Sequence, residues 1–223
     1  MLVLALDTAL AACSAAVFDS QRGLLATKSI PMLRGHAEAL LPLVEQVMDA
    51  AGVAFSSLDR IAVTVGPGSF TGLRVGVSAA RGIALAASKP AVGVTTLAAF
   101  AAPAQIEMPI LPVLAIVDAR HAQVYAQAFG ESVTTAEPRI TSLHEALEMA
   151  PAGPLRIAGN AAAQLAASWP TERPPPASVA DTPAPNIEWV ARLGVVAEVA
   201  APPKPLYLRA PDARPQARQL PRQ

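Results

Sequence analysis

Short runs of apolar residues alternate with longer stretches of helical periodicity along the first hundred residues. The short runs predict buried strands, at 2–6, 14–18, 24–30, 61–65 and 91–94. Apolar positions three or four apart predict helices over 36–51 and 70–88, with Gly52 as the stop of the first, and a shorter helix over 97–102. Strands that precede and alternate with helices in this way are typical of an α/β domain.

The opening pattern returns in the second half of the chain. The apolar run 113–117 ends in Asp118 as the first run ends in Asp7, and a shift of 111 residues also places Phe18 on Phe129. A repeat of this kind indicates two tandem units of the βββαβα type within an α/β fold.

We therefore expect an N-terminal domain over 1–102 and a C-terminal domain over 103–210. The second domain ends in a predicted helix over 186–200, which follows the proline-rich stretch 169–185, predicted to be a loop. Pro, Gln, Arg and Ala dominate 211–223, which favours a disordered tail.

Composition narrows the classes of function. The formal net charge is +0 and aromatic residues make up 4% of the chain, so there is no global reason to bind nucleic acid or an anionic membrane. A single cysteine, Cys13, fits a reducing compartment. No apolar run approaches the ~20 residues that span a bilayer, and the start MLVLALDTAL lacks the basic region of a signal peptide. These features favour a cytoplasmic protein that does not bind membranes.

A glycine-rich segment, VGPGSFTGLR, joins a predicted strand to the helix over 70–88. A Walker loop has Lys followed by Ser or Thr after its last glycine, and this pair is absent after Gly72. A dinucleotide-binding fingerprint could include Gly66 and Gly68, but its third glycine is replaced by threonine here. Ser69 lacks the glycine spacing of a nucleophile elbow. None of these three enzyme classes is favoured.

The helix behind this loop carries a small residue at every fourth position: Gly68, Gly72, Gly76, Ala80 and Ala84. Glycine inside a helix costs about 1 kcal/mol relative to alanine, so close packing must offset it. The rest of this helix is apolar almost all round, which predicts cover on more than one side. Two interpretations stay open: an internal helix of one domain, or a helix with one side on the sheet and another on a partner.

Candidate chemical groups are few. His36, His121 and His144 lie far apart in sequence and form no metal-binding helix pair. Asp7 and Asp118 end strands, where they either hold a metal-bound phosphate or cap the following turn. Four arginines are either RNA contacts or part of a solvated tail, namely Arg209, Arg214, Arg218 and Arg222.

Several segments together resemble the TsaB family, glycoprotease-like M22 proteins of tRNA threonylcarbamoyladenosine biosynthesis. These segments are LALDT, GHAEALLPLVEQVM, VGPGSFTGLRVGVSAARGIALA, PAVGVTTLAAFA, AIVDARHAQVYAQAF and PLYLR. The resemblance is good over residues 1–130 and looser over 130–210. It implies the actin/Hsp70/sugar-kinase (ribonuclease H-like) fold, which agrees with the repeat.

The resemblance also implies that a catalytic relative and this chain have different roles. The catalytic relative TsaD transfers a threonylcarbamoyl group to the adenosine next to the tRNA anticodon, using a metal held by a His-x-x-x-His motif. The matching positions here are Thr96 and Phe100, which are poor ligands. The chain is thus expected to be a non-catalytic scaffold, with no metal and no cofactor of its own; the weak candidates for a cofactor site are Asp7, Gly66, Gly68 and Asp118.

The partners implied by the resemblance are a TsaD-like subunit and a TsaE-like ATPase, with tRNA reached only through the complex. A homodimer is expected in isolation, and ATP or ADP at the subunit interface stays open. The family's interface is a helix bundle, which maps here onto the helices over 36–51 and 70–88. The residues expected at this contact are His36, Leu40, Val44, Val47, Gly72, Gly76, Ala79 and Ile83.

Two enzyme alternatives stay open at this point. One is a nucleotide hydrolase or kinase of the same fold that uses Asp7 and Asp118 on a magnesium-bound phosphate. The other is a metallopeptidase, as the older family name suggests.

Overall fold

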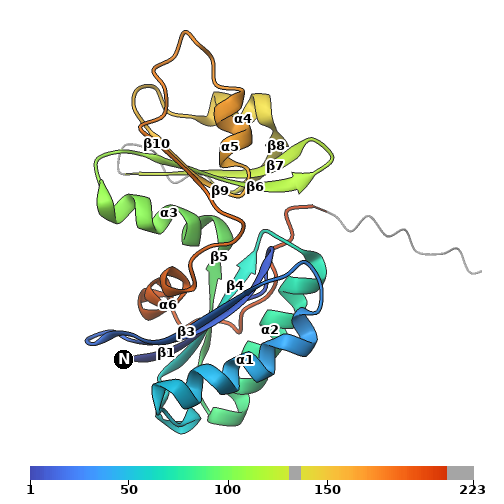
Figure 1. Cartoon of the computed structure of the whole chain (residues 1–223), viewed down its shortest axis with the longest axis vertical. Helices are drawn as coiled ribbons and strands as arrows, with labels where there is room; N and C mark the ends of the chain where they lie inside the picture. The colour runs from blue at the N-terminus through green and yellow to red at the C-terminus, as the bar shows by residue number, and fades with distance from the viewer. Residues whose placement is uncertain (131–136, 210–223) are drawn as a thin grey trace, which may run out of the picture.

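The computed structural model describes residues 1–130 and 137–209. Their strands form two sheets of five strands each, in the orders β3-β2-β1-β4-β5 and β10-β9-β6-β7-β8. Figure 1 shows one sheet above the other, with helices packed against both. This is the α/β architecture of two repeated halves that the sequence predicts.

The first half follows the predicted order closely. Its strands are β1 (Leu2–Asp7), β2 (Ala12–Asp19), β3 (Gly23–Pro31), β4 (Arg60–Gly66) and β5 (Ala91–Thr95). Its helices are α1 (His36–Ala51), the 3-10 turn η1 (Phe55–Ser57), α2 (Phe70–Ala87) and α3 (Thr96–Glu107). β1, β2 and β3 pair antiparallel, whereas β4 lies parallel to β1, and β5 to β4.

Local signals set the ends of the two long helices. Gly52 ends α1 in the left-handed conformation, with φ 63°, where glycine has no steric penalty. The Ser69 hydroxyl caps α2 by accepting a hydrogen bond from the Gly72 amide at 3.3 Å. Both helices therefore confirm the predicted spans, within one residue at the end of α2.

The second half repeats the order with shorter elements. They are β6 (Val113–Arg120), β7 (Gln123–Phe129), β8 (Arg139–Ser142), α4 (Leu143–Met149), β9 (Arg156–Gly159), α5 (Ala162–Ala167), β10 (Ser178–Asp181) and α6 (Ile187–Val196). β10 lies inside 169–185, so the prediction of a loop there is wrong for these four residues. It is an exposed edge strand, and it carries no apolar run that the sequence pattern could reveal.

The last helix belongs to the first sheet. α6 packs on β1, β2 and β4, on the face opposite to α1 and α2, and α3 lies between this layer and the second sheet (Figure 1). The predicted boundary at residue 102 lies within α3, and α6, from the predicted C-terminal domain, packs on the first sheet. The tail over 211–223, with Arg214, Arg218 and Arg222, lies outside the described residues.

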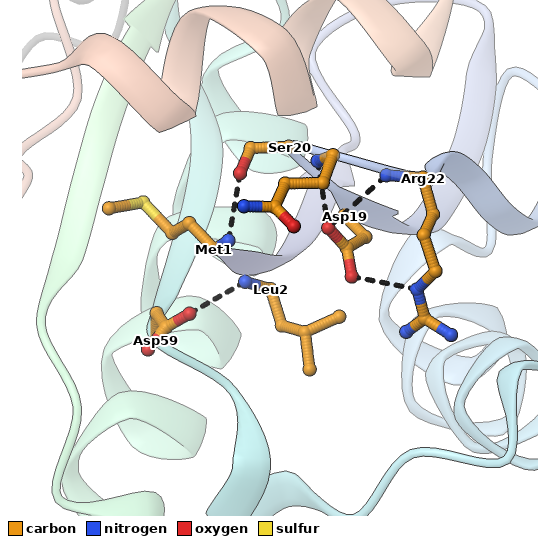
Figure 2. Close-up of polar contacts among 7 residues, drawn as sticks. Met1, Leu2, Asp19, Ser20, Arg22 and Asp59 are labelled. Atoms are coloured by element: carbon orange, nitrogen blue, oxygen red, sulfur yellow. Dashed lines mark hydrogen bonds and ion pairs between the residues drawn. The ribbon is translucent and has the colours of Figure 1, made fainter.

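The N-terminus is held in place by hydrogen bonds at the end of the first sheet where β1 and β4 begin. The Met1 ammonium donates to the Ser20 hydroxyl at 2.8 Å, and the Leu2 amide donates to Asp59 at 2.7 Å (Figure 2). Asp19, shown beside them, caps the β2–β3 turn. Within the described ranges, every helix is too short or too polar to cross a bilayer.

Candidate functional site

The glycine-rich loop packs against the turn that follows β1. The Ser69 amide donates to the Ala9 carbonyl at 2.8 Å, and a Cβ placed on Gly68 would lie 2.4 Å from the same oxygen. The peptide bond between Gly66 and Pro67 is cis. Glycine is needed at position 68 because the Ala9 backbone occupies the space that a Cβ would take.

The small residues along α2 are likewise explained by close contact with the turn that follows β1. A Cβ on Gly72 would lie 2.0 Å from the Thr8 carbonyl oxygen, and one on Gly76 would lie 2.4 Å from the Thr8 hydroxyl. That hydroxyl in turn donates to the Gly72 carbonyl at 2.7 Å. The stripe therefore brings α2 onto the end of its own β1, and the placement of Gly72 and Gly76 at a partner interface is wrong, because this side of α2 faces the sheet.

The side chains predicted on α1 are also turned inward. Leu40, Val44 and Val47 are at most 2% exposed and lie in the core with Leu4 and Leu6. These three cannot contact a partner across the surface of the folded chain, because their own sheet covers them.

His36 at the start of α1 is likewise buried. Its Nε2 lies 3.2 Å from the Leu10 carbonyl oxygen, so the ring is tied to the turn after β1. Of the residues predicted at the interface, Ala79 and Ile83 on α2 keep partial exposure.

The outward side of α1 and α2 consists of other residues. Apolar side chains stand exposed on it: Leu41 at 57%, Phe70 at 39% and Leu85 at 82%. The exposed charges are separated by helix, with Glu38, Glu45 and Asp49 on α1 and Arg74 and Arg81 on α2. We call these eight residues the outer α1–α2 face. Sequence periodicity did not find this face because α2 is apolar on nearly every side.

Asp7 is enclosed at the end of β1. Its Oδ1 accepts hydrogen bonds from the Ala9 amide at 3.0 Å and from the Thr64 hydroxyl, while Oδ2 has no partner among the described residues. Burial raises the pKa of the Asp7 carboxyl above its ordinary value of 3.8, against the opposing effect of the Thr64 hydrogen bond. Burial therefore disfavours the charged form of this carboxyl relative to an exposed aspartate.

Asp118, its counterpart in the second half, is exposed. Its Oδ1 accepts from the Arg120 amide at 2.8 Å, and its own amide donates to the Asn160 side chain at 2.8 Å. Left-handed φ values follow at Arg120, His121 and Ala122. The Asp118 carboxylate caps this tight β6–β7 turn, as strand-end aspartates often do.

A hollow of about 380 Å³ lies between the halves. It is lined mainly by apolar residues of β3, α3 and the segment that leads into α6, including Ala99, Phe100 and Ile187. Within 1–130 and 137–209, no three His, Cys, Asp or Glu side chains gather as a metal site would require. Thr96 and Phe100, which the resemblance matches to a metal-binding histidine pair, are both buried on α3.

The segment after α6 returns across the molecule and joins the two halves. The Leu206 amide donates to the Val65 carbonyl at 2.7 Å, and the Arg209 guanidinium donates to the Ala119 carbonyl at 3.0 Å. Between them, Tyr207 lies on α2 beside Phe70 and Arg74. We call residues 203–209 the strap.

Comparison with known proteins now identifies the family. Residues 30–183 match the model of TsaD, tRNA N6-adenosine threonylcarbamoyltransferase, over more than half of the chain. The chain belongs to this family. It is 38% identical over 125 residues to the tRNA threonylcarbamoyladenosine biosynthesis protein TsaB of Escherichia coli, which covers 56% of this chain and 53% of that protein. The alignment thus spans about half the length of that relative, and the resemblance to TsaB is confirmed.

Other relatives align with this TsaD-family chain over nearly its full length. An uncharacterized protein of Mycobacterium tuberculosis is 32% identical over 219 residues, covering 96% of this chain and 95% of its own. The solved structure of YeaZ from Pseudomonas aeruginosa has a TM-score of 0.78 and 29% identity, covering 93% of this chain and 99% of that one.

A more distant structure bears on the fold alone. The ROK hexokinase of Thermus thermophilus has a TM-score of 0.52 at 16% identity and covers 88% of this chain and 99% of its own. The actin/Hsp70/sugar-kinase fold implied by the resemblance is confirmed by this likeness together with that to YeaZ.

Proposed function

We propose that this chain is a non-catalytic subunit in tRNA threonylcarbamoyladenosine biosynthesis, which binds a TsaD-like transferase through the outer α1–α2 face. The observation that carries this proposal is that large apolar side chains stand exposed on two neighbouring helices that also carry exposed charges: Leu41 on α1, and Phe70 and Leu85 at the two ends of α2. Exposed apolar side chains bordered by charge mark interaction surfaces.

The size and charge of the face suit a protein partner. α1 and α2 have 16 and 18 residues, so each is about 25 Å long, and a pair of such helices offers an area of the order of a standard interface, about 800 Å² per partner. The acidic groups lie on α1 and the basic groups on α2. This separation would fix the register and orientation of the partner, since like charges placed opposite each other are unfavourable.

A second group of observations favours the absence of transfer chemistry in this chain. Thr96 and Phe100, the positions that the resemblance matches to the histidine pair of the transferase, are buried, and the Asp7 carboxyl is enclosed, with its pKa raised by burial. The glycine loop packs directly on the Ala9 backbone, so its Gly68 and Ser69 contact their own chain at this point. The hydrolase and metallopeptidase alternatives each require charged ligands that these positions do not supply.

The remaining partners belong to the same proposal. A TsaE-like ATPase would act on the complex, and tRNA would be reached through the transferase. In isolation the same face would pair with a second copy, because the acidic side of one copy complements the basic side of another. ATP or ADP would bind between the subunits of the complex.

A matched pair of substitutions tests the proposal. Leu85→Asp places a charge in the outer α1–α2 face, whereas Ile110→Asp places it at an equally exposed apolar side chain near the end of α3; the two are 82% and 86% exposed. Both variants should fold as the wild type does. By isothermal titration with the purified transferase of the same organism, Leu85→Asp should weaken binding at least about 100-fold and Ile110→Asp less than about threefold. Equal affinities for the two variants would refute the proposed face.

A further inference from the structure

We propose that the strap provides a second contact for the same protein partner, through the exposed ring of Tyr207 held beside Phe70 and Arg74. This inference rests on the proposed function, and it adds a contact from the far end of the chain to the outer α1–α2 face. The partner surface it fits carries carboxylates and apolar side chains.

The three side chains form a compact, partly exposed cluster. The Arg74 guanidinium lies 3.8 Å from the centre of the Phe70 ring, and its Nε donates to the Tyr207 hydroxyl at 3.1 Å. The Phe70 and Tyr207 rings lie 5.0 Å apart and are tilted by 34°. Both rings stay about 40% exposed, although the chain is rich in small aliphatic residues that could have covered them.

The strap is ordered on both sides of this ring. Leu206 is bonded to the carbonyl of Val65 in β4, and Arg209 to the carbonyl of Ala119 in β6. A side chain that is already fixed loses little conformational entropy when a partner covers it. Tyrosine, arginine and phenylalanine are also among the residues that contribute most where protein partners meet. The cluster therefore has the composition and the rigidity of a binding hot spot.

The cluster continues the proposed interface without a break. Phe70, Arg74, Arg81 and Leu85 follow one another along the exposed side of α2 at steps of four, seven and four residues, and Tyr207 lies beside the N-terminal end of this series. Arg74 and Arg81 give this side a positive charge, which complements a partner with carboxylates. Charge and continuity therefore favour the same protein partner over a separate one.

Affinity measurements on three variants test this contact. Tyr207→Ala should weaken binding to the purified transferase at least about tenfold, because it removes an exposed hot-spot ring. Tyr207→Phe should stay within about threefold, because it keeps the ring. Phe55→Ala is the matched control: Phe55 is 40% exposed and precedes β4, at the opposite end of that strand from the cluster, and its loss should leave affinity unchanged.

A crosslinking experiment separates direct contact from mere anchoring of the strap. With p-azidophenylalanine in place of Tyr207, illumination should link the chain to the transferase, and the same group at Phe55 should not. Affinity unchanged in Tyr207→Ala, or loss of affinity without a crosslink from position 207, would overturn the inference. Retained transferase binding with weaker tRNA binding by the complex would assign the cluster to RNA and would overturn it as well.

The two proposals fail differently. If Leu85→Asp prevents binding and Tyr207→Ala does not, the strap contact is wrong and the outer α1–α2 face stands. If the wild-type chain does not bind the transferase, both are wrong.

Discussion

The close approach of α2 to β1 makes a sharp prediction about two glycines in one helix. Gly72→Ala places a methyl group 2.0 Å from the Thr8 carbonyl oxygen, whereas Gly82→Ala places one where no atom lies within 4 Å. Both positions lie within α2, so both substitutions gain the same helical preference for alanine. The difference between them isolates the cost of the close approach.

The expected magnitudes follow from these distances. Alanine gains about 1 kcal/mol over glycine in a helix interior, so Gly82→Ala should stabilise the fold by about that amount. At Gly72 the obstructing atom belongs to the backbone and cannot rotate away, so overpacking costs about 3 kcal/mol. Gly72→Ala should therefore lower the free energy of unfolding by about 2 kcal/mol, after the helical gain is subtracted.

Urea unfolding of the two variants and the wild type measures both effects. The midpoint should fall for Gly72→Ala and rise for Gly82→Ala, with the dependence on urea unchanged, since the surface exposed on unfolding is the same. Thermal midpoints should shift by about 2–4 °C for each kcal/mol. If Gly72→Ala is as stable as Gly82→Ala, the glycine stripe does not mediate packing on β1, and its assignment to the interior of the chain is wrong.

Three further substitutions test the reading of individual contacts. The Asp7 carboxyl has a pKa raised above 3.8, so the folded state keeps this proton to a higher pH than the unfolded state does. The stability of the wild type relative to Asp7→Asn should therefore fall as pH rises above about 4. Urea titrations at several pH values measure this difference. Ser142→Ala removes the bond that the Glu145 amide donates to the Ser142 hydroxyl, one of the two bonds of the α4 capping box, and should cost about 1 kcal/mol in the same assay. Glu145 has its pKa lowered to about 2 by Thr141 and Ser142, so Glu145→Gln should be the less stable chain near neutral pH, and its disadvantage should shrink as pH falls from 4.5 toward 2.

The fold was largely predictable because its information is local. Apolar runs and helical spacing gave the strands and the two long helices of the first half, and the repeat of the Asp7 segment at Asp118 gave the second half. β10 was missed because an exposed edge strand of four residues has neither an apolar run nor alternation. The return of α6 to the first sheet was missed because it depends on tertiary packing rather than on the sequence of the helix.

The candidate site was less predictable, for a physical reason. Periodicity shows which residues are apolar, but α2 is apolar on nearly all sides, so its pattern does not tell the face on the sheet from the outward face. The sequence therefore assigned Leu40, Val44 and Gly76 to an interface, whereas they lie in the core or against β1. Tyr207 was missed because its neighbours, Phe70 and Arg74, are more than a hundred residues away in sequence.

We propose that this chain supports the transferase without performing the transfer itself. Mass spectrometry of nucleosides from tRNA, incubated with threonylcarbamoyl-adenylate and the purified proteins, measures both parts of this proposal. We expect modification with the transferase, the ATPase and the wild-type chain together, loss of modification when the chain is Leu85→Asp, and no modification by the chain alone. Modified adenosine formed by the chain alone, or undiminished when the chain is left out, would contradict it.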